Sequence, residues 1–155
     1  MIWVTLTLLS TFQTGQQQSS ADPPITVSLV AVQATNEGRR TKFVAPELIA
    51  VRQAVIGLDY DTFHQVKARR LRIAYGKESK FEITDRYTLY VRPISKSPDG
   101  RVRLSARITM TSKKEPKTAV NALDTTLIMA PGKHLNLGGL RLEVGELIVV
   151  LSLQN

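Results

Sequence analysis

The residue types that most often carry chemistry are few in this chain. It has no cysteine and two histidines, His64 and His134, which stand far apart with no other histidine near either. A zinc site would need the fold to bring them together, because the usual short ligand spacing is missing. The run Asp59, Tyr60 and Asp61 resembles a divalent-ion triplet, but it follows a segment expected to be helical, where aspartates commonly form turns. We expect no metal and no cofactor.

Motifs of nucleophilic and nucleotide chemistry are also missing. The sequence has no G-x-S-x-G nucleophile elbow and no dinucleotide glycine fingerprint, and Gly132 with Lys133 lacks the upstream glycine of a P-loop. A hydrolase that uses two scattered carboxylates would leave no such pattern, so it stays open as a third class beside the two binding functions below. We predict that the protein is not an enzyme.

Arginine is the residue type that offers the most chemistry. The chain has 21 Lys and Arg against 13 Asp and Glu, a formal net charge of +8, which favours acidic partners. Many arginines fall on the polar phase of segments that we expect to be strands, so pairing of these strands would gather them on one sheet face. Guanidinium groups bind carboxylates and phosphates through paired hydrogen bonds, and a tyrosine in the same phase can stack on a ring or base. The candidate binding residues are Arg70, Arg72, Arg86, Tyr90, Arg92, Arg101, Arg103 and Arg107.

This arginine face has two interpretations. It is either a solvated surface, with long arginine stems that cover a sheet, or a binding surface. As a binding surface it would recruit an acidic protein or a polyanionic glycan. The alternative function is a small basic β-domain that binds nucleic acid through phosphate contacts and base stacking. An exported chain rarely meets nucleic acid, so location separates the two.

The beginning of the chain reads as a secretory signal peptide. Residues 2–9 form a short apolar run, residues 13–20 are polar and uncharged, and Ser19 and Ala21 supply the small residues that signal peptidase needs. No Lys or Arg precedes the apolar run, and an extra strand or an unstructured tail is the alternative interpretation. The run is too short for a permanent membrane anchor.

Cleavage after Ala21 would leave Asp22 as the first residue of the mature chain. We therefore expect a signal peptide over 1–21 and a single β-rich domain over 22–155, located in the periplasm or secreted, with no membrane span in the mature chain. A composition of 43% hydrophobic and 22% charged residues is typical of a chain that folds. Without cysteines, its stability must come from packing. Whether it forms an oligomer stays open.

Beyond Pro23 and Pro24 the pattern predicts mostly short strands. Apolar residues alternate with polar ones, which is typical of half-buried strands, and the apolar run 147–151 indicates burial on both faces. Asp99 with Gly100 is a strong hairpin signal. One substantial helix is expected from Pro46 onward. The fold class is α+β and strand-rich, a mostly antiparallel sheet or sandwich, with strands expected near 25–34, 71–75, 81–83, 87–91, 102–110, 120–130, 134–137 and 146–153.

Three stretches of the second half resemble the β-module of bacterial secretins, the outer-membrane pores of secretion and pilus systems. They read LYVRPISKSPDGRVRLSARITM, LDTTLIMAPGKHLNLGGL and GELIVVLSL. The resemblance implies that 87–91 pairs with 102–108 and that 125–129 lies beside 134–137. It rests on Pro93, Asp99, Gly100, Val102, Leu104, Thr125, Thr126, Gly132, Gly138, Gly139, Leu140, Glu146 and Leu147.

Departures from that family limit what the resemblance implies. Secretins usually have a longer stretch rich in Pro and Gly where this chain has only 141–145, and repeated periplasmic domains usually precede the module. The resemblance therefore implies a related β-module used as a stand-alone component of the envelope. Together these expectations describe an exported, non-enzymatic binding or assembly module that recruits an acidic partner through an arginine-lined sheet face.

Overall fold

Nine strands and one short helical segment make up the part of the chain that the computed structural model describes, residues 22–154. The expected signal peptide over 1–21 lies outside these residues. The elements are β1 (Ile25–Thr35), β2 (Phe43–Val44), the 3₁₀ helix η1 (Pro46–Val51), α1 (Arg52–Val55), β3 (Thr62–Ile73), β4 (Ser79–Glu82), β5 (Tyr87–Lys96), β6 (Val102–Thr111), β7 (Ala119–Met129), β8 (His134–Arg141) and β9 (Glu146–Gln154).

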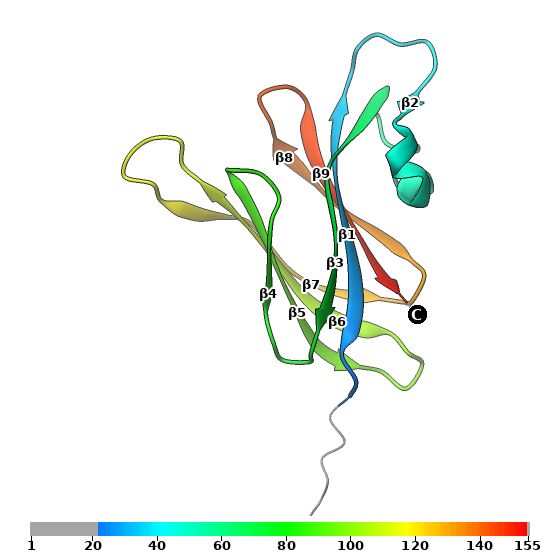
Figure 1. The fold of residues 1–155 in the computed structure, drawn as a ribbon, viewed down its shortest axis with the longest axis vertical. Coiled ribbons are helices and arrows are strands. Elements are labelled where there is room, and N and C mark those ends of the chain that lie inside the picture. The colour runs from blue at the N-terminus through cyan, green and yellow to red at the C-terminus, as the bar shows by residue number, and fades with distance from the viewer. Residues whose placement is uncertain (1–21, 155) are drawn as a thin grey trace, which may run out of the picture.

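The strands form two sheets that pack face to face (Figure 1). The larger sheet has the order β2-β3-β1-β9-β8 and the smaller one the order β4-β5-β6-β7. Neighbouring strands are antiparallel, except that the two residues of β2 run parallel to the start of β3. The expected strand-rich, mostly antiparallel fold is confirmed.

The main core lies between the two sheets and follows from the period-two pattern of the sequence. Alternate residues of β5 and β6, among them Leu89, Val91 and Leu104, are fully buried against the larger sheet, where they meet Val27 and Leu29 of β1. The residues between them point to the opposite side. The outer face of the smaller sheet therefore carries the polar half of the pattern.

A second, smaller core lies on the other face of the larger sheet. The helical segment η1 and α1 covers part of that face (Figure 1), and Leu48 and Val55 pack there against Val32 and Ile148. The strands β1 and β9 are thus covered on both faces, as the apolar run 147–151 predicted. The expected helix from Pro46 is present, but its first six residues are 3₁₀.

The hairpin of β5 and β6 is confirmed. The two strands pair antiparallel with Tyr87 opposite Met110 and Val91 opposite Ala106. Gly100 takes a φ of 84°, in the left-handed region that glycine tolerates best. Its N–H donates to the carbonyl of Ser97 at 2.9 Å and closes the turn.

The expected neighbourhood of 125–129 and 134–137 is wrong. Although Pro131 and Gly132 do make a turn, β7 pairs with β6 in the smaller sheet, whereas β8 pairs with β9 in the larger one. The turn is therefore a crossover between sheets. Gly138 and Gly139 mark an irregularity inside β8, because the register shifts between Leu137 and Leu140.

The first half of β3 was not expected as a strand. Its residues 64–70 are all exposed, so the alternation that reveals a half-buried strand is lost there. Tyr75, expected in this strand, lies just beyond its end at Ile73. Within 22–154, no helix is both long and apolar enough to span a bilayer.

Candidate functional site

Half of the eight predicted binding residues share one surface. Tyr90 and Arg92 on β5 and Arg103 and Arg107 on β6 lie between inward-pointing core residues, so their side chains are on the outer face of the smaller sheet. The antiparallel register places Tyr90 directly opposite Arg107. Cross-strand partners of this kind are in contact distance.

The other four residues lie elsewhere, so the expected single array is wrong. Arg70 and Arg72 are on β3 in the larger sheet, opposite Ser28 and Thr26 of β1. The alternation in the sequence shows the phase of each residue along its strand, but it does not show which sheet the strand joins. Arg86 and Arg101 precede β5 and β6 in the turns that lead into them.

Arg92 and Arg103 form the most available pair of cations on the outer face of the smaller sheet. Arg92 stands opposite Ser105, and Arg103 stands opposite Ser95, so the two arginines are diagonal neighbours across β5 and β6 with small side chains beside them. The register shifts between them, where Ile94 is left unpaired and partly exposed. Both arginine side chains are long, so one anion bound over this part of the sheet face can accept hydrogen bonds from both. Both are exposed, and neither takes part in an ion pair within residues 22–154.

Arg107, by contrast, already has partners within the chain. Its guanidinium lies 3.3 Å from the carboxylate of Glu78 and 4.3 Å from the centre of the Tyr90 ring. It also stands opposite Asp124 of β7. One face of Tyr90 is therefore covered by a cation, and Arg107 is less free than Arg92 or Arg103 to bind an external acid.

Arg101 serves the turn between β5 and β6. Its Nε donates to the carboxylate of Asp99 at 2.6 Å, and its backbone N–H donates to the same carboxylate. These hydrogen bonds, the one from the Arg101 side chain above all, hold the pKa of Asp99 below its usual value. The ion pair belongs to the hairpin, so Arg101 is a weak candidate for partner binding.

Arg86 is partly buried at one end of the sandwich. Its guanidinium lies 5.8 Å from the centre of the Tyr87 ring, and its Nη2 is 3.4 Å from the sulfur of Met110. The Nε atom is buried and has no hydrogen-bond partner among the described residues. A cavity of about 240 Å³ adjoins it, lined also by Lys113 and Arg141 but with Glu143 and Asp85 as well. Because carboxylates and cations both line this cavity, Arg86 does not belong to an open cationic surface.

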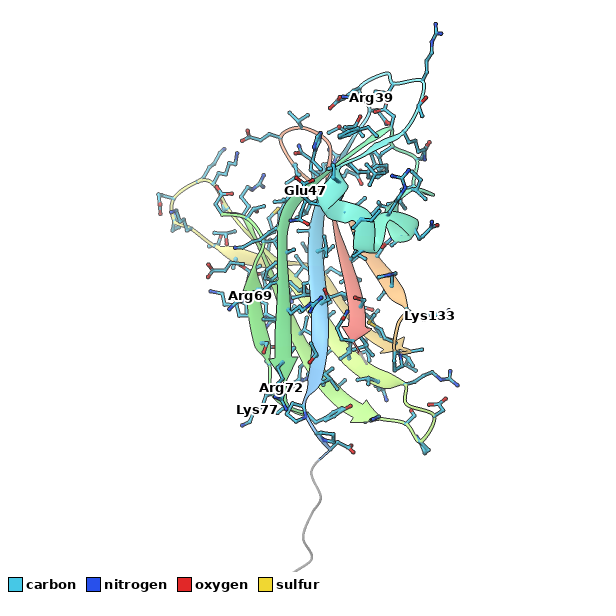
Figure 2. All side chains as sticks on the ribbon, turned by 45° about the vertical axis from the view of Figure 1, so that its right-hand side comes forward. Arg39, Glu47, Arg69, Arg72, Lys77 and Lys133 are labelled. Atoms are coloured by element: carbon cyan, nitrogen blue, oxygen red, sulfur yellow. The ribbon has the colours of Figure 1, made fainter. Side chains whose placement is uncertain are left out.

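A further cluster of cations was only half identified from the sequence. Lys67 and Arg69 join Arg70 and Arg72 on β3, which puts four cations into six residues of a strand without Asp or Glu. Figure 2 shows Arg69 and Arg72 along this strand and Lys77 just past it. The run of cations in 67–72 is visible in the sequence. Without apolar alternation in 64–70, however, nothing indicates that Lys67 and Arg69 lie on the same strand as Arg70 and Arg72.

The two histidines and the acidic triplet have structural partners. His64 lies on β3 with its ring 5.4 Å from that of Phe43, whereas His134 begins β8, and β1 and β9 separate these strands. Asp61 accepts hydrogen bonds from the backbone N–H groups of Glu37 and Arg39 and so shapes the loop after β1. In the described part of the chain, no three His, Asp or Glu residues are grouped as a metal site would need.

Comparison with protein-family models, curated proteins and solved structures finds no match. The resemblance to secretins therefore stays a prediction. Of its two structural expectations, the β5–β6 hairpin is confirmed and the pairing across Pro131 and Gly132 is wrong.

Proposed function

We propose that this chain is a non-enzymatic binding or assembly module of the cell envelope, which recruits an acidic partner through the outer face of its smaller sheet. The observation that carries the proposal is the pair Arg92 and Arg103. The two side chains are exposed on the same sheet face, in diagonal positions across β5 and β6, and neither has an acidic partner among residues 22–154.

The surroundings of this pair favour binding over mere solvation. Like charges on adjacent strands repel each other, and the same sheet shows how such repulsion is relieved inside the chain, because Arg107 pairs with Glu78 and Lys80 with Glu82. Arg92 and Arg103 lack this relief. A carboxylate placed between them would accept hydrogen bonds from both guanidinium groups and remove the repulsion.

Nucleic acid is the second candidate partner. A single-stranded nucleic acid would need exposed aromatic rings as stacking platforms along a cationic groove. On this face Tyr90 is the aromatic residue, and Arg107 occupies one side of its ring. We therefore favour an acidic protein or a polyanionic glycan, in line with the export signal read in 1–21. The intact mass of the protein from its native host would test the export step, with Asp22 expected first.

The function is tested by the binding of poly-L-glutamate to the protein and to the double variant Arg92→Gln/Arg103→Gln. We expect the variant to bind about tenfold more weakly at low salt. Each exposed charge contact contributes up to about 1 kcal/mol, and the loss of two such contacts amounts to about a factor of ten in affinity. The melting temperature should hardly change, because both side chains are exposed. Heparin and single-stranded DNA serve as the glycan and nucleic-acid arms.

The matched control is Lys114→Gln/Lys117→Gln, which removes the same charge from the exposed loop between β6 and β7. It should lower affinity by less than about threefold. Equal losses in the two variants would mean that net charge alone drives retention, and the proposed surface would be wrong. Stronger retention on DNA than on poly-L-glutamate or heparin would move the nucleic-acid function to first place.

A further inference from the structure

The strand β3 has a free edge along most of its length. On one side it pairs with β1 from Thr62 to Ile73, and on the other side the short β2 covers only Thr62 and Phe63. The register shift opposite Ala31 leaves Val66 as a bulge, so the regular part of the free edge is 67–73. No backbone group of this stretch is bonded to any described residue outside the ladder with β1.

This free edge is strongly cationic. Lys67, Arg69, Arg70 and Arg72 contribute four positive charges over roughly 20 Å of strand, and none of them is in an ion pair with a described residue. Lys67 donates to the backbone carbonyl of Glu82 at 2.5 Å, which ties its head to the neighbouring edge of the smaller sheet. The three arginines are exposed beside the open backbone.

Protection of the edge against aggregation does not by itself explain why four cations are concentrated on this one edge. A charged residue on an edge strand discourages pairing with other chains, and natural proteins place lysines there for that reason. The other long edge, β7, needs such protection more, because Val120 and Ile128 are 50% and 67% exposed, yet Asp124 is its one charged residue. The cations are thus concentrated on β3 rather than distributed over the edges.

We propose that the edge 67–73 of β3 receives an extended acidic segment of a partner protein as an additional strand of the larger sheet. Backbone hydrogen bonds to the unpaired N–H and C=O groups would supply affinity. The cations, Lys67 and Arg69 on one face of the sheet and Arg70 and Arg72 on the other, would select carboxylate side chains on the incoming strand. This surface lies in a different sheet from Arg92 and Arg103. The inference therefore does not depend on that pair.

A second copy of this chain fits the edge poorly. Antiparallel pairing of two β3 strands would set eight cations along one seam without any Asp or Glu from either strand, and like charges opposite each other destabilise a sheet. An acidic strand would instead place carboxylates opposite the four cations, and opposite charges across a strand pair stabilise the sheet. Charge complementarity thus selects the occupant.

The test uses the peptide Ac-(Val-Glu)4-amide, which has high strand propensity and four carboxylates. Amide hydrogen exchange of the protein is measured by NMR with and without the peptide. In the free protein, the edge-facing amides of 67–73 should exchange quickly, and saturation with peptide should slow alternate amides by about tenfold or more, because strand pairing protects every second residue. A peptide with N-methylated backbone amides keeps the carboxylates but cannot complete the ladder, and it should not protect them.

Two variants complete the design. Arg70→Gln/Arg72→Gln should weaken peptide binding about tenfold, whereas Arg92→Gln/Arg103→Gln should leave the exchange pattern of β3 unchanged. Binding without protection of β3, or equal binding of the N-methylated peptide, would overturn strand addition while leaving the proposed function intact. Protection of β7 or β8 instead of β3 would overturn it as well, as would protection of β3 that grows with protein concentration in the absence of peptide.

Discussion

Gly145 lies where the turn between β8 and β9 crosses the end of β1. Its φ is 75°, and a Cβ on this residue would overlap the carbonyl oxygen of Ala34. The side chain of Gln33 donates to the neighbouring Val144 carbonyl at 2.7 Å, so the turn is held closely against the strand. A side chain at position 145 would have to displace backbone rather than a flexible group.

We expect Gly145→Ala to lower the free energy of unfolding by about 3 kcal/mol or more, because backbone strain and a backbone clash add. Denaturant unfolding measures the loss. Gly132→Ala is the matched control, since Gly132 has a φ of 73° but nothing within 4 Å of a Cβ. It should cost about 1–2 kcal/mol from the strained φ alone. Losses of the same size in both variants would show that the β1 contact is not close.

Asp61 makes the loop after β1 sensitive to acid. The hydrogen bond from the N–H of Glu37 is the main cause that lowers its pKa from 3.8 to about 2, and Thr62 and the N–H of Arg39 add to it. A lowered pKa means that the folded state favours the carboxylate. Its contribution to stability is therefore complete above the unfolded value and is lost as the pH falls from 3.8 to about 2.

The variant Asp61→Asn should consequently be less stable than the parent protein at neutral pH, and the difference should shrink as the pH falls through this window. Denaturant unfolding at neutral pH, at about pH 4 and at about pH 2 would follow it. Asp59→Asn removes the same charge but none of these hydrogen bonds and should show no such trend. A difference between parent and Asp61→Asn that stays constant down to about pH 2 would contradict the assignment.

Among the strands and turns, the sequence pattern correctly predicts one hairpin and the most deeply buried strand. The β5–β6 hairpin follows from Asp99 and Gly100 between two alternating segments, and the burial of β9 on both faces follows from its apolar run. The β7–β8 connection did not follow, because a tight turn with Pro131 and Gly132 looks the same whether the chain returns within one sheet or crosses to the other.

The strand β3 shows a second limit of sequence patterns. An edge strand exposed on both faces has no apolar alternation, so its first residues were not recognised, and Lys67 and Arg69 were omitted from the candidate site. Likewise, the polar phase of Arg70 and Arg92 was recognisable, but their separation into two sheets depends on long-range pairing that no local pattern contains. The candidate site was therefore only half predicted.

For the whole molecule, the net charge of +8 is unevenly distributed. β3 and β4 belong to different sheets, and Lys67 bridges them through its hydrogen bond to the backbone carbonyl of Glu82. From β4 the smaller sheet continues to Arg92 on β5 and Arg103 on β6. The helical segment covers part of the outer face of the larger sheet, where its apolar residues pack on β1 and β9, and the register with β1 puts Arg70 and Arg72 on that same face. The molecule thus carries two separate cationic surfaces, one in each sheet.

Chemical-shift mapping by NMR during a titration with poly-L-glutamate tests this account most directly. We predict that the largest changes fall on Arg92, Arg103 and their neighbours on the outer face of the smaller sheet, with a second group on 67–73 of β3. Raising the salt concentration should reverse both groups, because screening weakens contacts between exposed charges. Changes confined to the helical segment, changes spread evenly over all surface lysines and arginines, or no binding at low salt would contradict an acidic-partner module.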